Sequence, residues 1–347
     1  MDILENVPLA PMTTLQVGGP ARYFVQVSTS ADAAQAVDWA KSRQLPLFVL
    51  GGGSNLVVAD RGIAGLVLKI AIGGIERRSE NGKEVFEAGA GVEWDTLVAR
   101  AVAANCAGLE CMSGIPGTVG GTPVQNVGAY GQDVSQTITE VQVLDLRDGR
   151  LCALCNEACG FEYRSSIFNT AERGRYIILR AAYALEPGGE PTVEYRDLKT
   201  YFATAAKVRP TLAEVREAVQ TIRHSKAMLI VEGEEDARSA GSFFKNPVLD
   251  AGEYKRVSAL ENGPMPSYPT GNQRFKIPAA WLVEKAGFHK GYACGSVGIS
   301  RKHALAIVNR GGATAAEIVV LKNEIQRAVF EKFGVALTPE PVFVGFE

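Results

Sequence analysis

The feature that most constrains this chain is a glycine-rich stretch at residues 113–131, S-G-I-P-G-T-V-G-G-T-P-V-Q-N-V-G-A-Y-G. Six of its nineteen residues are glycine, against an average of about 7%. Because glycine has no side chain, such a backbone can turn sharply and lie directly against a ligand. A flexible linker would lack the regularly placed Ile, Val and Pro of this stretch. We interpret it as a rigid ligand-binding loop, with a buried crossover of tight turns as the alternative.

A second glycine-rich loop, G-G-G-S-N at residues 51–55, follows the apolar run L-F-V-L. Its consecutive backbone N–H groups suit the oxygens of a pyrophosphate. Neither loop carries the Gly-Lys-Ser/Thr of a Walker motif or the G-x-G-x-x-G of a Rossmann fold. Together the two loops favour a dinucleotide that is held in a different way.

Length and charge limit the class of protein. A chain of 347 residues exceeds one ordinary core, so we expect two or three domains. A net charge of −2 argues against nucleic acid or an anionic membrane as the main partner. The sequence has no run of eighteen apolar residues and no signal-peptide pattern at its start. We expect a cytoplasmic protein that works as a monomer.

The cysteine pattern raises the question of a metal site. Cys152, Cys155 and Cys159 form C-x2-C-x3-C, but no second cysteine or histidine pair follows to complete a zinc site. In a reducing compartment the default role of such residues is that of small buried apolar groups. We therefore expect no metal.

Hydrophobic periodicity and turn residues predict the elements of the fold. Strands and helices mix without a steady βαβ rhythm, so the fold class is α+β. Capping boxes T-L-A-E at 211–214 and T-A-A-E at 314–317 mark two helix starts, and P-G-G at 187–189 marks a domain boundary. We expect helices at 30–44, 93–105, 197–205 and 279–286 and strands at 21–27, 45–50, 304–308 and 342–345.

Three polar residues outside the glycine loops are candidates for chemistry. Arg164 lies among hydroxyls in F-E-Y-R-S-S-I-F and could stabilise an anion, or be a surface cation with a packed stem. Ser242 in A-G-S-F-F-K-N-P lacks the G-x-S-x-G elbow of a hydrolase, which leaves a backbone-bonding serine or a proton donor to a carbanion or enolate. Glu340, between two prolines before an apolar strand, is the third. His224 and His303 lie beside basic residues, and we expect no site role for them.

Seven blocks follow one another along the chain: 13–21 (T-T-L-Q-V-G-G-P-A), 51–55 (G-G-G-S-N), 114–121 (G-I-P-G-T-V-G-G), 125–131 (Q-N-V-G-A-Y-G), 159–168 (C-G-F-E-Y-R-S-S-I-F), 241–247 (G-S-F-F-K-N-P) and 337–340 (L-T-P-E). In these blocks and their order the sequence resembles the UDP-N-acetylenolpyruvoylglucosamine reductase (MurB) family, in its longer-looped type I branch, over almost the whole chain. The resemblance implies an N-terminal FAD-binding domain of the two-lobed vanillyl-alcohol-oxidase (PCMH) type and a C-terminal α+β substrate domain. The implied limits are 1–70 and 71–190 for the two lobes and 191–347 for the substrate domain, whose last strand returns to the FAD domain.

The resemblance also implies the reaction. NADPH reduces non-covalently bound FAD and leaves, and UDP-N-acetylglucosamine enolpyruvate then accepts a hydride at its vinyl carbon to become UDP-N-acetylmuramate. Arg164 and a protonated Glu340 stabilise the enolate-like intermediate, and Ser242 protonates it. The implied FAD-binding residues are Gly51, Gly52, Gly53, Ser54, Asn55, Ser113, Gly114, Ile115, Pro116, Gly117, Thr118, Gly120, Gly121, Gln125, Asn126, Gly128, Ala129 and Tyr130.

The implied substrate contacts are Tyr195, Lys226, Asn246, Tyr268 and Lys276. The family's longer-looped branch has a short, proline-containing connection after the lysine, whereas here residues 227–238 are longer, apolar and then acidic. Cys152 and Cys155 also lie outside the family pattern. Two other functions stay open at this point: an FAD-dependent oxidase or dehydrogenase of a small alcohol or hydroxy acid, and a flavin- or nucleotide-binding module without turnover.

Overall fold

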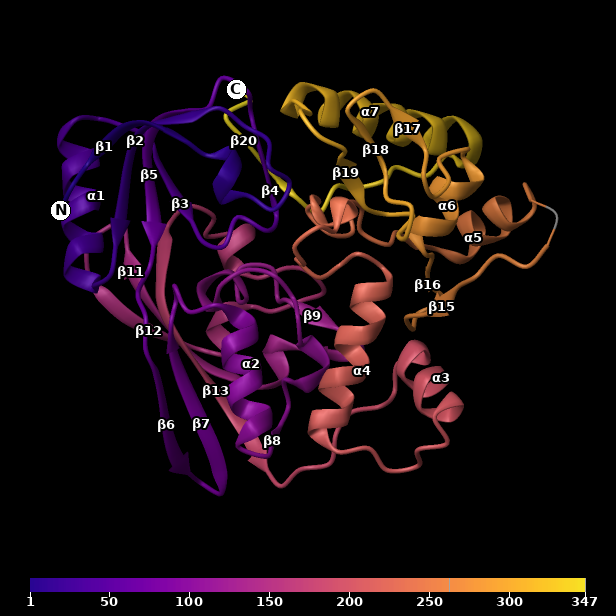
Figure 1. The fold of residues 1–347 in the computed structure, drawn as a ribbon, viewed down its shortest axis with the longest axis horizontal. Helices are drawn as coiled ribbons and strands as arrows, with labels where there is room; N and C mark the ends of the chain where they lie inside the picture. Colours follow the sequence, from indigo (N-terminus) through magenta and orange to yellow (C-terminus); the bar gives the residue numbers. More distant parts are fainter. Residues whose placement is uncertain (262, 347) are drawn as a thin grey trace. The chain divides into compact units, whose positions relative to one another are not determined.

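The structure is a computed structural model that describes residues 1–261 and 263–346 (Figure 1). The chain forms two compact units, and each is described by itself. The predicted limits at 70 and 190 define a different division and stay a prediction. Unit 1 comprises Met1–Val7, Ala21–Gly53 and Ala64–Ser225, and unit 2 comprises Pro8–Pro20, Ser54–Ile63 and Lys226–Glu347.

Unit 1 begins with a four-stranded sheet in the order β1-β2-β5-β3, in which β3 pairs with β5 in parallel. Helix α1 (Ser30–Ser42) starts where the side chain of Thr29 accepts a hydrogen bond from the Asp32 N–H. Its buried alanines and Val37 join the same core as the inward side chains of β5. The strands are β1 (Leu4–Pro8), β2 (Pro20–Val27), β3 (Leu47–Leu50) and β5 (Ile63–Ile70).

The second sheet of unit 1 has six strands in the order β12-β11-β13-β7-β6, with β8 also pairing with β13. All of its pairings are antiparallel. Strands β6, β7 and β13 lie side by side as long neighbours (Figure 1). The strands are β6 (Ile75–Glu80), β7 (Lys83–Gly89), β8 (Cys106–Ala107), β11 (Ile138–Asp145), β12 (Leu151–Cys155) and β13 (Tyr176–Pro187).

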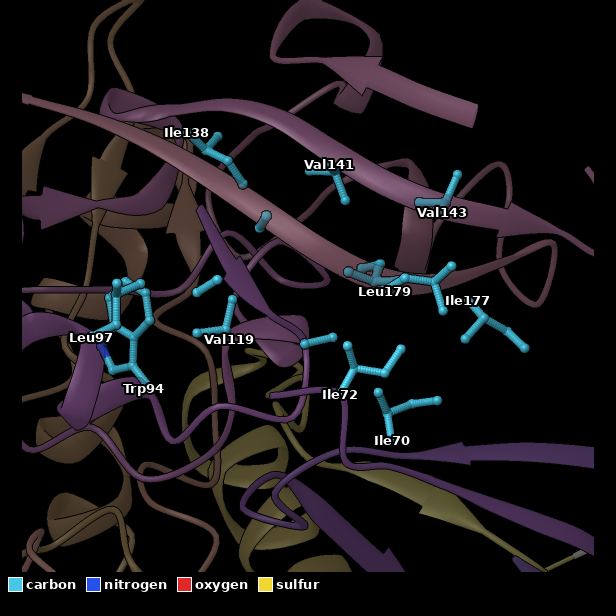
Figure 2. Packing of buried hydrophobic residues seen from close by; sticks show 14 of the residues in the cluster. Ile70, Ile72, Trp94, Leu97, Val119, Ile138, Val141, Val143, Ile177 and Leu179 are labelled. Atoms are coloured by element: carbon cyan, nitrogen blue, oxygen red, sulfur yellow. The ribbon is translucent and has the colours of Figure 1, made fainter. Parts of the chain in front are cut away.

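One apolar core joins the two sheets to helix α2 (Trp94–Ala103). Figure 2 shows side chains from β5, α2, β11 and β13 converging on this interior. Trp94 is fully buried, and its indole Nε1 donates to the Met112 carbonyl at 3.0 Å, so its one polar atom has a partner. The labelled core residues are Ile70, Ile72, Trp94, Leu97, Val119, Ile138, Val141, Val143, Ile177 and Leu179.

Helices α3 (Arg196–Thr204) and α4 (Leu212–Ser225) add a smaller apolar cluster to unit 1. The predicted capping box is present, because the Glu214 N–H donates to Thr211 Oγ1 and the Thr211 N–H donates to the Glu214 carboxylate. Tyr130 of the glycine-rich stretch belongs to this cluster. Helix α4 therefore packs on the predicted ligand-binding loop.

Unit 2 is built around the long helix α7 (Ala315–Phe333), whose buried face packs on helix α6 (Ala279–Lys285) and two strands. Thr314 and Glu317 form the second predicted capping box. Asp60 adds a carboxylate at the same helix start, where it accepts from the N–H groups of Ala315 and Ala316. The strands are β4 (Leu56–Val58), β14 (Val248–Leu249), β15 (Tyr268–Pro269), β16 (Phe275–Lys276), β17 (Ala293–Cys294), β18 (Val297–Ile299), β19 (Ile307–Asn309) and β20 (Val342–Val344).

The last strand, β20, pairs in parallel with β4, which lies inside the predicted first lobe. Helix α5 (Ala251–Ser258) was not expected, although its capping box, Asp250 with Glu253, is legible in the sequence. Short elements complete the described chain: η1 (Ala10–Met12), η2 (Glu110–Met112), η3 (Val119–Gly121), η4 (Val134–Gln136), η5 (Glu157–Cys159), η6 (Ile167–Asn169), η7 (Glu235–Ala237), β9 (Gly128–Ala129) and β10 (Gln132–Asp133).

Candidate active site

The two glycine-rich loops touch backbone to backbone within unit 1. A Cβ placed on Gly52 would lie 2.5 Å from Gly117 Cα and 3.0 Å from Thr118 N, so no side chain fits there. Lys69 Nζ donates to the Gly51 carbonyl. Burial lowers the pKa of this lysine, although the negative charge of Glu93 acts to raise it. The sequence did not single out Lys69. The two loops thus meet through backbone atoms at a position where only glycine fits.

Thr118 gives this surface a polar group without a use in the fold. Its Oγ1 is buried and has no hydrogen-bond partner among the described residues. A Cβ on Gly51 would lie 3.2 Å from it, so the hydroxyl faces the first glycine loop. A buried hydroxyl without a partner costs free energy, which a hydrogen bond to a ligand oxygen would recover. This hydroxyl and the glycine cradle fit a phosphate-containing group.

An ion pair from two helices fixes the peptide of Gly114 at the start of the long loop. Asp95 on α2 accepts from the Gly114 N–H at 2.6 Å, and Arg216 on α4 donates to both carboxylate oxygens of Asp95, each at 2.6 Å. Burial acts to raise the pKa of Asp95, but the hydrogen bonds from Arg216 and Gly114 lower it overall. Arg223, itself buried, donates to the Gly114 carbonyl at 3.2 Å.

These contacts were missed from the sequence, because partners 19 to 121 residues apart have no local pattern. Downstream in the loop, burial raises the pKa of Tyr130 to about 12, which keeps its phenol neutral. The ring of Tyr130 meets the ring of Tyr195 edge to face, with centroids 5.4 Å apart. Tyr195, a predicted substrate contact, is half exposed beside a predicted cofactor residue.

Arg164 lies at the tip of a tight hairpin in unit 1. Glu162 and Ser165 bridge across it, and Arg164 itself has a φ of 55°. A left-handed arginine is strained, and such strain concentrates at functional sites. Its Nη2 donates to the Gly128 carbonyl at 2.8 Å. The hairpin therefore holds Arg164 against the long glycine-rich loop.

In unit 2 the structure pairs the segment that follows Ser242 with the segment that ends at Glu340. The segments 243–245 and 338–340 pair as an antiparallel bridge, in which the Glu340 N–H donates to the Phe243 carbonyl at 2.9 Å. Buried Phe243 and Phe244 anchor the first segment. Asn55, a predicted cofactor residue, donates through Nδ2 to the Glu340 carbonyl at 3.2 Å.

One partner of Ser242 was missed. Ser242 Oγ lies 3.3 Å from His303 Nε2, although we expected no site role for this histidine. Its position beside Lys302 indicated only a basic surface. The two residues are 61 positions apart, so only the fold shows that they are in contact.

The remaining predicted substrate residues have varied surroundings. Tyr268 on β15 is half exposed and pairs across the ladder with Lys276 on β16. Asn246 Oδ1 accepts from the Ala279 N–H at 2.8 Å, at the start of α6, so this oxygen serves the fold. Lys226 is partly buried where unit 2 resumes after α4.

The cysteines do not assemble a metal site in the part of the chain that the structure describes. Cys152 and Cys155 are exposed on β12, whereas Cys159 is buried and burial raises its pKa to about 12. Among the same described residues no helix is long and apolar enough to cross a membrane.

The chain is similar to known proteins along nearly its whole length. A family model of the UDP-N-acetylenolpyruvoylglucosamine reductase C-terminal domain matches residues 233–344, and a model of an FAD binding domain matches residues 21–154. The UDP-N-acetylenolpyruvoylglucosamine reductase of Thermobifida fusca is 45% identical over 349 residues and covers 98% of both chains. That of Streptomyces coelicolor is 43% identical, over 99% of this chain and 90% of the relative.

A solved structure agrees. The crystal structure of UDP-N-acetylenolpyruvylglucosamine reductase (MurB) from Thermus caldophilus superposes with a TM-score of 0.65 at 26% identity, covering 99% of this chain and 98% of that one. The predicted α+β fold, an FAD-binding domain followed by a C-terminal domain, is confirmed, and so is FAD as the cofactor. With relatives above 40% identity that cover almost all of both chains, this chain belongs to the UDP-N-acetylenolpyruvoylglucosamine reductase family of oxidoreductases.

Proposed function

We propose that this enzyme reduces UDP-N-acetylglucosamine enolpyruvate to UDP-N-acetylmuramate in peptidoglycan precursor synthesis, with NADPH as the hydride donor. The observation that supports it best is the backbone pairing of 243–245 with 338–340. That pairing holds a hydroxyl, on Ser242, beside the segment of a carboxyl group, on Glu340. A hydroxyl and a carboxyl group on adjoining segments suit a reaction that makes and then protonates an enolate.

The residues have distinct tasks in this proposal. FAD, when bound, supplies the chemistry that carries a hydride from a nicotinamide to a vinyl carbon. Negative charge then develops on the carbon next to the substrate carboxylate. Arg164, by its charge, and Glu340, in its protonated form, would stabilise that charge, and Ser242 would donate the proton that ends it.

The substrate itself is a nucleotide sugar with a pyrophosphate and a carboxylate. Tyr268 and Lys276, opposite one another on β15 and β16, offer a phenol and an ammonium to the pyrophosphate. Because Asn246 Oδ1 is used by α6, its Nδ2 is the group that we assign to substrate. Tyr195 would line the nicotinamide and substrate site, and Lys226 would add a cation.

We also propose that the enzyme works in the cytoplasm as a monomer. The six cysteines form no disulfide in the described chain, in keeping with a reducing compartment. Light scattering of the purified protein measures its mass in solution, and the mass of a dimer would contradict the monomeric state.

The function is tested by following flavin absorbance without oxygen. The purified protein should be yellow, NADPH should bleach it, and UDP-N-acetylglucosamine enolpyruvate should restore the colour with formation of UDP-N-acetylmuramate. A protein that is bleached by NADPH but not reoxidised by this substrate would refute the proposal. Reoxidation by oxygen together with oxidation of a small alcohol or hydroxy acid would favour an oxidase.

A further inference from the structure

The hydrogen bond between Ser242 and His303 has a defined donor and acceptor. The Leu305 N–H donates to His303 Nδ1 at 3.1 Å. A neutral imidazole has one donor and one acceptor nitrogen, so a ring that accepts at Nδ1 carries its proton on Nε2. That Nε2–H faces Ser242 Oγ at 3.3 Å and donates to it.

Because His303 is the donor, it determines where the hydroxyl hydrogen of Ser242 can point. A hydroxyl has one hydrogen and two lone pairs, and the histidine occupies one lone pair. The hydrogen of Ser242 is then left to point at another acceptor. When the hydroxyl gives up that hydrogen, the bond from Nε2–H becomes charge-assisted, and such bonds are about twice as strong as neutral ones.

We propose that His303 is a positioning residue for Ser242, which orients its hydroxyl hydrogen and stabilises the alkoxide left by proton donation. The proposal rests on the proposed function, in which Ser242 is the proton donor. In the step, the Oγ–H bond of Ser242 breaks and a C–H bond forms at the carbon next to the substrate carboxylate. His303 keeps its proton, and the alkoxide regains a hydrogen from water.

The fold ties the two residues together through a single residue, Leu305. Leu305 donates its N–H to His303, while its carbonyl accepts from the N–H of Phe243, the residue after Ser242, at 2.8 Å. A shift of the His303 ring, or of the backbone that follows Ser242, would have to break one of these bonds. Such rigid support is what keeps a reactive hydroxyl in one geometry.

The acidic end of the unusual segment 227–238 holds the turn at residues 300–303, which carries His303. Asp236 is buried and accepts from Ser300 Oγ at 3.0 Å and from the Arg301 N–H at 2.7 Å. Ser300 Oγ in turn accepts from the His303 N–H at 3.2 Å. We assign this segment the task of holding the turn that carries His303.

Two substitutions at one position separate the hydrogen bond from the packing. His303→Ala removes the donor, whereas His303→Gln keeps an amide N–H at about the reach of Nε2. Stopped-flow measurement of the two half-reactions should show flavin reduction by NADPH unchanged in both. Reoxidation by the enolpyruvyl substrate should fall about 10–100-fold in His303→Ala, in line with a hydrogen bond to a charged group, and should recover at least tenfold in His303→Gln. His289→Ala, at an exposed histidine, is the matched control and should match wild type.

A double substitution adds a measurement that a merely structural role would not move. In a Ser242→Ala background, His303→Ala should cause less than a twofold further loss, because its effect passes through the serine. Equal slowing of both half-reactions, full additivity with Ser242→Ala, or no recovery in His303→Gln would each overturn the proposal. Failure of the wild type to use the enolpyruvyl substrate would instead refute the proposed function.

Discussion

The packing of Gly52 against Gly117 makes a sharp prediction about the FAD-binding surface. Gly52→Ala would add a Cβ 2.5 Å from Gly117 Cα and 2.9 Å from its carbonyl carbon. Carbon atoms in contact lie about 3.5–4.0 Å apart, so the new methyl group is about 1 Å too close. Its neighbours are backbone atoms, so one of the two loops must move as a whole. Gly52 has no positive φ, and the effect is therefore steric alone.

The expected loss of stability follows from two opposing effects. Forcing a methyl group into a packed interior costs about 1–3 kcal/mol, and the upper end applies here because backbone atoms, not the end of a flexible side chain, must give way. Replacing glycine by alanine also restricts the unfolded chain, which returns about 0.4–1 kcal/mol. The net loss is about 2 kcal/mol. At about 2–4 °C per kcal/mol, Tm should fall by about 4–8 °C.

The assay compares three alanine variants by thermal unfolding of the flavin-free protein and by FAD titration. Gly73→Ala is the matched control in unit 1, because its Cβ would meet nothing within 4 Å and its φ is not positive. Gly121→Ala, in the long loop, also meets open space and should keep its Tm while it weakens FAD binding. Gly52→Ala should have a lower Tm and should also bind FAD more weakly. A Tm for Gly52→Ala within 1 °C of the Gly73 control would refute the close-packing reasoning.

Two further substitutions test the proton donor and the clamp on Gly114. In Ser242→Ala, NADPH should reduce the flavin at nearly the wild-type rate while substrate-driven reoxidation collapses, and equal loss in both half-reactions would contradict a proton-donor role. In Asp95→Asn, Tm should be lower than wild type at pH 7, and the gap should close in acid. The reason is that a carboxyl whose pKa is lowered on folding stabilises the protein above its unfolded pKa, about 3.9, and loses this effect as the pH falls through the folded value. A gap that widens in acid would contradict the assigned contacts.

The local elements were predictable because their signals are local. The capping boxes at 211–214 and 314–317 start α4 and α7 as expected, and the predicted helix at 93–105 is α2. Glycine content indicated a side-chain-free loop, and the structure shows why no Cβ fits at Gly52. At these positions a few neighbouring residues decide the conformation.

Long-range pairing was not predictable from the same rules. Nothing near Asp95 in sequence points to Arg216, and nothing near Asn55 points to the Glu340 carbonyl. Such contacts depend on topology, since a strand or helix does not specify its partner by local pattern. The candidate residues Ser242 and Glu340 were found from their unusual neighbours in sequence, but only the fold shows that the segments next to them pair.

The predicted strand at 304–308 is the most instructive difference. The run A-L-A-I-V suits a strand, yet β19 begins only at Ile307. In place of a ladder, the Leu305 N–H is taken by His303 Nδ1 and the Ala306 N–H by the His303 carbonyl. The histidine thus competes with the sheet for backbone donors, and the turn it forms directs its Nε2–H to Ser242. Natural proteins depart from local sequence rules most often at functional sites. The absence of residues 304–306 from β19 is therefore a second indication that His303 belongs to the site.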